Sequence, residues 1–488
     1  MWPRWLFLRA LGLIFFSAFY ALAFQIHGLV GERGILPARL YLERISTAFG
    51  PVARVWFAPT ILWINAADWA LTVIVSAGLV TSVLLVLNIW PRLTTALCTI
   101  LFLSCISGLQ DFSSYQSDGM LLEAGFLSAF FAPRGVRPGL GITDPASPLS
   151  LFMLRWEWFR IYFESGLVKL LSGDLHWRNF TAMDDYYQNA PLPSWMGWYV
   201  QQLPHWYHAG TVLITLAVEL VLVWAVFLPR RFRIACFVFV TALQIGIITT
   251  ANYGFLNYIV LALGVLLLDD RALARARFPL ASPLPRELTT RFRIYRRVEA
   301  GVLGVAFYTT IAAFAFGGSD SILALPNKLL QPFRIANAYG LFAVMTPARY
   351  EIEFQGSTDG KTWVQYRFRY KPQDPNERPG FFGPYQPRFD WNLWFASLEP
   401  WGESPWVVLT EERLLEGSPS VLGLFREDPF FGKQPSMVRS ILSQYWFTDL
   451  ETRRKTGAWW RRKELGLFSP GVTRAKDGST LLSTTSLP

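Results

Sequence analysis

The chain has 488 residues, of which only 16% are charged and another 16% are aromatic, including 21 tryptophans. A soluble protein carries about 25% charged residues, so this composition excludes an ordinary water-soluble chain and predicts an integral membrane protein. The formal net charge is +10, but the basic residues gather in short loops between apolar segments, which indicates membrane topology and predicts no nucleic-acid partner.

Apolar segments recur from the N-terminus to about residue 317. We interpret the first, Ala10–Ile26, as a retained transmembrane helix because no small-x-small cleavage site follows it; a cleaved signal peptide is the alternative. A bilayer requires roughly 20 apolar residues, and 119–132 and 255–268 are short enough to be tilted or re-entrant. Residues 1–317 are therefore predicted to form a polytopic α-helical membrane bundle of seven to nine transmembrane helices. The later apolar segments lie near 69–87, 93–109, 119–132, 149–171, 210–228, 234–250, 251–268 and 298–317.

The distribution of arginine predicts the orientation of this bundle. With nine helices and an inner N-terminus, the inner segments hold sixteen arginines and the outer loops hold five. Because basic residues are retained on the cytoplasmic side, we expect a cytoplasmic N-terminus. Everything after about residue 318 then lies on the opposite side of the membrane.

Ionisable groups interrupt the predicted helices, and such groups are costly in a bilayer unless they are paired or line a cavity. On 149–171, Glu157, Arg160 and Glu164 recur at i, i+3 and i+7 and share one helical face. This face is interpreted as a buried ion network, a substrate-facing or proton-handling site, or an amphipathic interfacial surface. Glu123 and Glu219 are expected to accept hydrogen bonds or salt bridges from Arg160 or Lys169. The predicted intramembrane polar cluster is Asp118, Glu123, Glu157, Arg160, Glu164, Lys169, Glu219, Asn252 and Asn257.

The predicted outer loop, residues 172–209, mixes aromatic and charged residues. An aromatic belt at the membrane surface accounts for its Trp and Tyr residues, but not for Trp177-Arg178 or Asp184-Asp185, so we expect this loop to serve recognition. His205 and His208 have i,i+3 spacing but no adjacent acidic ligand, and the three cysteines form no C-x-x-C motif. With no P-loop, G-x-S-x-G or Rossmann glycines, no metal site and no cofactor are predicted.

From residue 318 to residue 488 the pattern changes, since no apolar run of membrane length follows. Tyr350–Phe354 alternates with period two, Asp359-Gly360 marks a turn, and Trp363–Tyr370 alternates again. Asp-Gly between two alternating runs is typical of a hairpin. Residues 318–488 are therefore predicted to form a β-rich extracytoplasmic domain with its own core.

Ordered motifs across residues 110–470 resemble those of the lipase maturation factor family. In the bundle and its loop these are Asp118-Gly-Met-Leu-Leu-Glu123-Ala-Gly-Phe126, Gly166-Leu-Val-Lys169-Leu, Trp177-Arg178, Met183-Asp184, Tyr186-Tyr187, Ala190-Pro191-Leu192-Pro193 and Ala251-Asn252-Tyr253-Gly-Phe255-Leu-Asn257. In the tail they are Asn337-Ala-Tyr339-Gly-Leu-Phe342, Lys371-Pro-Gln-Asp374-Pro, Pro387-Arg388-Phe-Asp390-Trp391, Trp394-Phe395-Ala396, Asp428-Pro429-Phe430 and Trp459-Trp460-Arg461-Arg462.

The resemblance implies a polytopic protein with a large domain across the membrane, acting in the folding or assembly of secreted lipases. The excess of arginine over lysine favours a bacterial member, with an inner-membrane bundle and a periplasmic tail; a eukaryotic member would sit in the endoplasmic reticulum membrane with a lumenal tail. The tail is shorter than in animal members of the family, and the cysteines are too few for thiol exchange with a lipase. Help to a client is therefore expected to be non-covalent or to act through a partner.

We therefore predict a chaperone-like maturation factor rather than an enzyme, with the lipid bilayer and an exported, lipase-like client as partners. Tryptophans of the loop and tail would supply contact area, while Arg178 with Asp184, and Arg388 with Asp390, would shape their loops. The alternative is a membrane-embedded enzyme or lipid handler that uses the charges of 149–171, with Lys169 as base; a transporter is a third possibility. The predicted client-binding or motif residues are Trp177, Arg178, Asp184, Tyr186, Asn337, Tyr339, Arg388, Asp390 and Trp391.

Overall fold

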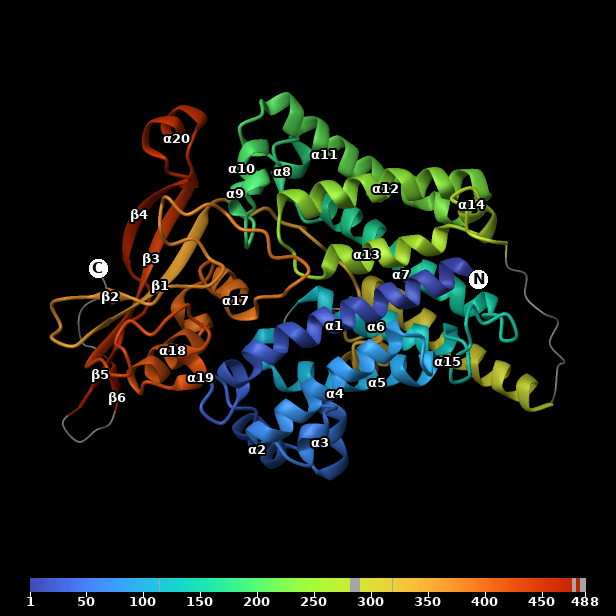
Figure 1. Ribbon diagram of the computed structural model, residues 1–488, viewed down its shortest axis with the longest axis horizontal. Coiled ribbons are helices and arrows are strands. Elements are labelled where there is room, and N and C mark those ends of the chain that lie inside the picture. The colour runs from blue at the N-terminus through green and yellow to red at the C-terminus, as the bar shows by residue number, and fades with distance from the viewer. Residues whose placement is uncertain (114, 281–289, 318, 476–479, 483–488) are drawn as a thin grey trace.

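The computed structural model describes residues 1–113, 115–280, 290–317, 319–475 and 480–482. Figure 1 shows two parts: long helices run side by side along the horizontal axis, and the strands lie together at one end of them. The N-terminus lies at the opposite end of the helices, far from the sheet. We call the end of the bundle beside the sheet its tail-proximal end.

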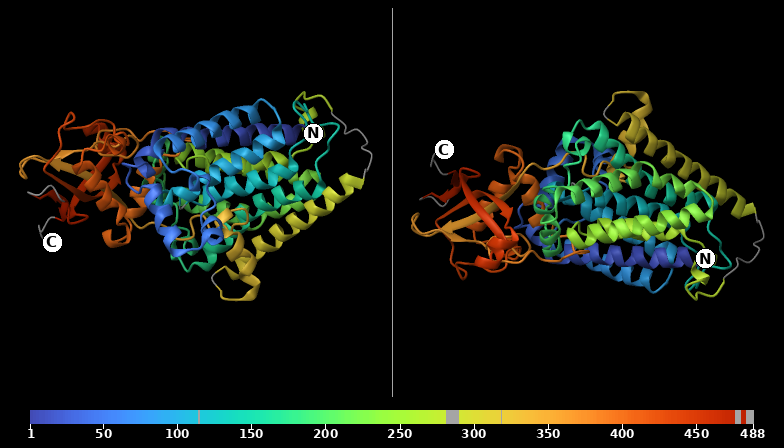
Figure 2. Two further views of the ribbon diagram at one scale, coloured as in Figure 1. Left: turned by 90° about the horizontal axis from the view of Figure 1, so that it is seen from below. Right: turned by 90° about the horizontal axis from the view of Figure 1, so that it is seen from above.

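The long helices of the bundle coincide with the apolar segments that the sequence predicts. Successive helices pack as antiparallel neighbours through apolar side chains, and the views in Figure 2 show that α15 runs along the outside of the group, where it contacts α7. The helices are α1 (Trp2–Val30), α4 (Asp68–Val86), α5 (Pro91–Gly108), α6 (Gln116–Phe131), α7 (Pro148–Leu171), α11 (His205–Leu220), α12 (Arg230–Thr250), α13 (Leu256–Gly264) and α15 (Thr290–Phe316). The 3-10 turns η3 (Leu222–Phe227) and η4 (Val265–Leu267) extend α11 and α13.

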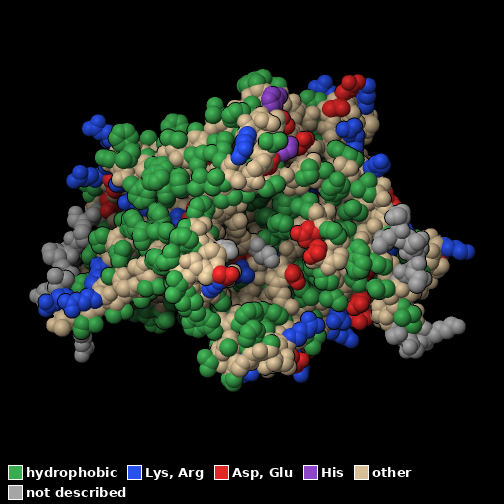
Figure 3. Space-filling model, turned by 180° about the vertical axis from the view of Figure 1, so that it is seen from behind, with side chains coloured by type: hydrophobic (Ala, Val, Ile, Leu, Met, Phe, Trp, Pro, Cys, Tyr) green, Lys and Arg blue, Asp and Glu red, His purple; other side chains and the backbone are tan. Residues whose placement is uncertain are grey.

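Within the described residues, six helices are long and apolar enough to cross a membrane, namely α1, α4, α5, α11 with η3, α12 and α15. The bundle is therefore a membrane bundle, as the composition predicts. Charged residues interrupt α7, while α6 and α13 are short, and all three lie inside the bundle. In Figure 3 the side chains of Lys, Arg, Asp and Glu gather mainly toward the two ends of the molecule, and the broad middle of the bundle is largely hydrophobic.

Short helices cover the tail-proximal end of the bundle. Asp174 and Ser194 cap α8 and α10 by accepting the backbone N–H groups of His176 and Gly197, which satisfies donors that the first turn of a helix leaves free. The short helices are α2 (Ala38–Ala48), α3 (Pro51–Phe57), α8 (Leu175–Arg178), α9 (Tyr186–Asn189), α10 (Trp195–Gln201) and α16 (Leu325–Leu330), with α14 (Asp270–Ala274) at the far end.

The tail contains one antiparallel sheet with strand order β2-β1-β3-β5-β6, and β4 also pairs with β3. The predicted hairpin is present, since Gln355 of β1 lies opposite Gln365 of β2. Its second strand is much shorter than the predicted Trp363–Tyr370, and the long partner of β1 is β3 at its other edge, with Arg349 opposite Tyr445. The strands are β1 (Arg349–Ser357), β2 (Val364–Gln365), β3 (Met437–Phe447), β4 (Trp460–Leu467), β5 (Val472–Arg474) and β6 (Thr480–Leu482).

The tail is an α+β unit, so the β-rich description is incomplete. Four helices accompany the sheet: α17 (Arg388–Ala396), α18 (Trp406–Leu415), α19 (Pro419–Leu422) and α20 (Leu450–Thr456). Polar residues alternate with apolar ones along β1, but the polar side of this strand does not face solvent, because Glu351 and Glu353 are fully buried. Lys371 Nζ lies 2.7 Å from Glu351 Oε2, and Tyr445 Oη donates to Glu353 Oε1 over 2.6 Å, so partners compensate the burial of both carboxylates.

Candidate functional site

The tail meets the bundle through the segment that follows α16, which lies on α6 and α7 at the tail-proximal end. Glu123 of α6 and Arg160 of α7 form an ion pair in which both side chains are 1% exposed. Arg160 Nη1 also donates to the backbone oxygen of Asn337 over 2.6 Å. The guanidinium lies 5.1 Å from the ring centroid of Tyr339. The ion pair of the bundle is therefore completed by the tail.

The second oxygen of Glu123 accepts three hydrogen bonds from the same segment. The donors are the backbone N–H of Asn337 at 3.1 Å, Asn337 Nδ2 at 3.0 Å and Tyr339 Oη at 2.9 Å. Glu164 accepts the backbone N–H of Tyr339 at 2.7 Å. We call Glu123, Arg160, Glu164, Asn337 and Tyr339 the junction clamp. Apart from Arg160 Nε, which has no partner among the described residues, these contacts offset the burial of the charged groups, since an unpaired ion in the interior would be strongly destabilising.

Gly119 leaves the room that the clamp requires. A Cβ atom at this position would lie 2.9 Å from Asn337 Oδ1, a distance that real Cβ contacts do not tolerate. Asn337 Nδ2 donates to the backbone oxygen of Gly119 over 3.1 Å. The predicted one-face grouping on α7 is correct, since Glu157, Arg160 and Glu164 are all buried. Arg160 pairs with Glu123 of α6 and not within α7, which confirms the expectation that Glu123 accepts a salt bridge from Arg160 or Lys169.

A second buried ion pair joins the tail to the start of α6. Arg388 Nη2 lies 2.7 Å from Asp118 Oδ1, Arg388 Nη1 donates to Asp118 Oδ2 over 2.8 Å, and both side chains are fully buried. Tyr115 Oη donates to the backbone oxygen of Arg388 over 3.1 Å. The prediction that Arg388 pairs with Asp390 is therefore wrong, because the bidentate geometry of the guanidinium is used across the junction instead.

Asp390 of α17 is buried beside Lys371. It accepts the backbone N–H of Tyr370 over 3.3 Å. Burial raises the pKa of Asp390 from 3.8 to about 7, and the charge of Lys371 opposes that rise. At neutral pH this carboxyl is thus poised between its neutral and charged forms.

The outer loop is also tied to the tail segment. Trp177 is 1% exposed, and its Nε1 donates to the backbone oxygen of Phe342 over 3.0 Å. Lys169 lies 5.1 Å from the Trp177 ring centroid and forms the predicted type of pair with Glu219, at 2.8 Å. Phe342 has a left-handed φ of 56°, a conformation that is uncommon for a non-glycine residue and that the bond from Trp177 supports.

Arg178 and Asp184 do not pair with each other. Arg178 donates to the backbone oxygen of Leu170 over 3.0 Å, while Asp184 lies 3.0 Å from Nδ1 of His205. His208 is buried, and its ring packs against that of Tyr187. Among the described residues, no group of three His, Cys, Asp or Glu side chains has the geometry to hold a metal ion.

The two asparagines of the cluster have different surroundings. Asn252 Oδ1 accepts the backbone N–H of Phe382 over 2.7 Å, so it is a further contact between bundle and tail. Asn257 Nδ2 donates to Gln244 Oε1 over 2.7 Å inside the bundle. The predicted polar cluster is therefore several separate contacts rather than one site.

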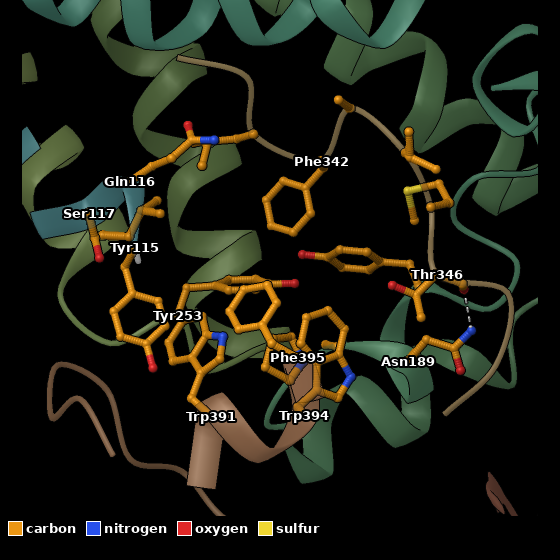
Figure 4. A pocket seen from close by; sticks show the side chains of 18 residues that line it. Tyr115, Gln116, Ser117, Asn189, Tyr253, Phe342, Thr346, Trp391, Trp394 and Phe395 are labelled. Carbon is orange, nitrogen blue, oxygen red and sulfur yellow. Dashed lines mark hydrogen bonds between the residues drawn. The ribbon is translucent and has the colours of Figure 1, made fainter. Parts of the chain in front are cut away.

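An aromatic cavity of about 320 Å³ lies at the junction, between α9, α13, the 341–346 segment and α17. Figure 4 shows Tyr115, Tyr253, Phe342, Trp391 and Trp394 around this space. The ring centroids of Tyr253 and Phe342 are 5.1 Å apart, and those of Tyr115 and Trp391 are 5.3 Å apart. Of the predicted client-binding residues, Tyr186 and Trp391 line this cavity.

Polar atoms in the cavity wall lack partners. Within the described ranges, the indole nitrogens of Trp391 and Trp394 and Oδ1 of Asn189 have no hydrogen-bond partner, although all three side chains are buried. Buried groups of this kind usually find a partner. Three residues of the cavity wall thus carry a polar atom with no partner among the described residues, but each of these atoms is covered by its neighbours and does not face the open space.

Sequence reasoning missed several residues of the junction. Arg349 is fully buried, pairs with Glu351 and donates to backbone oxygens of Gln188, Ala190 and Pro191 in the outer loop. Arg349 is the first residue of β1, and an arginine at the end of a strand is usually exposed. Nothing in the neighbouring sequence therefore indicates that it is buried against the outer loop. Tyr253 and Trp394 belong to motifs shared with the lipase maturation factor family, so the motifs could have indicated their place in the site.

Comparison with known proteins gives one consistent result. Residues 2–275 match the family model of the lipase maturation factor transmembrane domain, and residues 335–470 match that of the lipase maturation factor C-terminal domain. Lipase maturation factor 1 of Bos taurus is 31% identical over 96% of this chain and 89% of its own length. Lipase maturation factor 1 of Homo sapiens is 30% identical over 96% of this chain and 88% of its own length. Lipase maturation factor 2 of Gallus gallus is 29% identical over 96% of this chain and 81% of its own length. No solved structure matches the chain significantly.

Removing one partner of the Asp118–Arg388 pair should destabilise the protein strongly. We expect Arg388→Met to lower the free energy of unfolding by about 3–5 kcal/mol, because it leaves a buried carboxylate unpaired. Thermal unfolding of the purified protein in detergent measures the effect. The double variant Asp118→Leu/Arg388→Met should recover most of the loss, since no buried charge then remains unpaired.

The exposed pair Arg39–Glu43 provides the control for that experiment. Its side chains are 69% and 55% exposed, and Arg39→Met should change stability little because surface pairs contribute little. An Arg388→Met protein as stable as the wild type would contradict a structural role for the buried pair.

Titration of Asp390 should make stability depend on pH. Because its folded-state pKa is raised from 3.8 to about 7 by burial, the native state binds more protons than the unfolded state within this window, and stability falls as pH rises from about 4 to 7. Asp390→Asn should flatten part of this slope and raise the melting temperature at pH 8. The measurement is a series of melting curves between pH 5 and pH 8, and an unchanged slope would show that Asp390 does not titrate there.

Proposed function

This chain belongs to the lipase maturation factor family, and we propose that it is a membrane-anchored maturation factor that assists the folding or assembly of exported proteins such as lipases. The similar proteins are named lipase maturation factors, and their similarity extends through both the bundle and the tail. Both parts are therefore expected to take part in the same function.

The proposed arrangement has seven to nine crossings, formed by the six long helices together with members of the group α6, α7 and α13. It divides the chain into a bundle of residues 1–317, with the loop 172–209 on the outer side, and an extracytoplasmic domain of residues 318–488. The arginine distribution supports a cytoplasmic N-terminus, and the N-terminus lies at the end of the bundle away from the tail (Figure 1). The tail would then be periplasmic in a bacterial inner membrane, or lumenal in an endoplasmic reticulum membrane.

The aromatic cavity is the proposed contact site for the client. Its aromatic walls suit the apolar side chains of a client segment. An aromatic cavity at the junction of bundle and tail, lined by Tyr186 and Trp391 of the motifs, is the observation that carries the proposal. The cavity reaches the surface at Val344 and Phe395, which are 67% and 43% exposed.

A non-covalent mechanism is part of the proposal. Thiol exchange needs an accessible thiolate, whereas Cys98, Cys105 and Cys236 are all buried. The charged residues of α7 favour a maturation factor over the alternative of a membrane-embedded enzyme. Arg160 and Glu164 bind α6 and the tail segment and so have a structural role.

Substitutions at the mouth and in the wall of the aromatic cavity should impair maturation of a client lipase without unfolding the protein. We expect Val344→Asp to reduce both the activity of a co-expressed exported lipase and its cross-linking to the factor by about tenfold, because a charge at the mouth opposes entry of an apolar segment. The double variant Trp391→Phe/Trp394→Phe should also weaken cross-linking, since it replaces two indoles of the cavity wall by smaller rings and so reduces the aromatic contact area.

Phe431→Asp is the matched control, because Phe431 is 93% exposed on the tail and does not line the cavity. It should leave lipase activity and cross-linking unchanged. Normal lipase maturation by folded Val344→Asp and Trp391→Phe/Trp394→Phe proteins would refute the cavity as the client site.

A further inference from the structure

A second cavity, of about 490 Å³, lies within the bundle between α7, α10, α11, α12 and α13. It is separate from the junction clamp and shares only a wall with the client cavity proposed above. Its long walls are formed by Ile161–Lys169 on α7 and by Ala242–Thr250 on α12. Each of these stretches has nine residues and is about 12 Å long, close to the roughly 15 Å thickness of one leaflet of the hydrocarbon core.

This cavity opens through the lipid-facing side of the bundle. Ala242 and Gly246, one turn apart on α12, both line it and are exposed. A Cβ atom at Gly246 would have no neighbouring atom within 4 Å. In Figure 1, α11 and α12 diverge toward the start of α11.

The surface around the opening is apolar. Leu213 of α11 and Phe239 and Ile245 of α12 are 58%, 63% and 52% exposed. Both helices are apolar enough to cross a membrane, so hydrocarbon rather than water surrounds the opening. A gap of this size facing acyl chains is filled by them, because an empty apolar cavity loses its packing contacts.

The two ends of the cavity differ in polarity. At the deep end, Gln244 Nε2 donates to Tyr162 Oη over 2.8 Å and Gln244 Oε1 accepts from Asn257, so these polar groups satisfy one another. At the tail-proximal end, Lys169 Nζ donates to both oxygens of Glu219, at 2.9 and 2.8 Å. This pair has no net charge and therefore favours an uncharged or zwitterionic head group over an anionic one.

We propose that this cavity binds one acyl chain of a glycerolipid from the tail-proximal leaflet. The chain lies between α7 and α12, and the ester and glycerol oxygens lie beside the Lys169–Glu219 pair. Tyr207 and Thr211 also line the cavity, but along α11 they lie about 18 and 12 Å from Glu219, so their hydroxyl groups can bond only to parts of the lipid beyond these oxygens. The proposal requires that the chain crosses a membrane but does not depend on any client.

The test uses the full chain reconstituted in phosphatidylcholine vesicles that contain a phosphatidylcholine with a photoreactive diazirine on one acyl chain. After irradiation, peptide mapping should find label on internal residues of Ile161–Lys169 and Asn257–Val260, in addition to the exposed faces of α11 and α12. Gly246→Trp should reduce the internal label about tenfold while leaving the external label unchanged, because the indole fills the space of several methylene groups.

Gly210→Trp is the matched control, since a Cβ atom at Gly210 on α11 also has no neighbour within 4 Å and the residue does not line the cavity. It should keep the internal label. Ala242→Phe provides a second cavity-filling variant if Gly246→Trp does not fold. The proposal is wrong if internal label is absent from the wild type or persists in folded filled variants, and equally if a water-soluble diazirine labels these residues in place of the lipid.

Discussion

The position of the tail depends on how one carboxylate inside the bundle is neutralised. Glu123 needs a cation and several hydrogen-bond donors because it is buried among apolar helices. Arg160 supplies the charge, and Asn337 and Tyr339 supply the donors. The bundle alone would leave one oxygen of Glu123 without these partners, at a cost of several kcal/mol. The tail segment is therefore part of the interior of the bundle, and the two parts stabilise each other.

The sequence predicts the helices well because their signal is local. Apolar length alone locates α4 and α12 within a few residues. The partners of the buried charges are not local, since Asp118 and Arg388 are 270 residues apart. Neighbours such as Asp390 offered simpler pairings, and periodicity could not distinguish them from the correct one. In the same way, alternation predicts β1 but not that its long partner is β3.

The quoted motifs mix residues that build the junction with residues that line the aromatic cavity. Trp177, Tyr339 and Arg388 are buried and make defined hydrogen bonds or ion pairs between distant segments. Trp391 lies in a cavity wall and has an indole N–H with no acceptor in the described part of the chain. A motif residue without an internal partner is the better candidate for contact with another molecule, because packing alone does not account for its polar atom.

The two cavities share a wall, and this links the two sites that they form. Tyr186, Leu256 and Phe342 line both of them. Phe342 is held from one side by the Trp177 indole, and the neighbouring Leu341 N–H donates to Ser165 Oγ over 3.1 Å. An acyl chain in one cavity and a client segment in the other would therefore contact opposite sides of the same side chains. If both occupants bind differently to the positions of Phe342, each changes the affinity of the other by the same factor, and under the two proposals the membrane lipid would then influence client binding without touching the client.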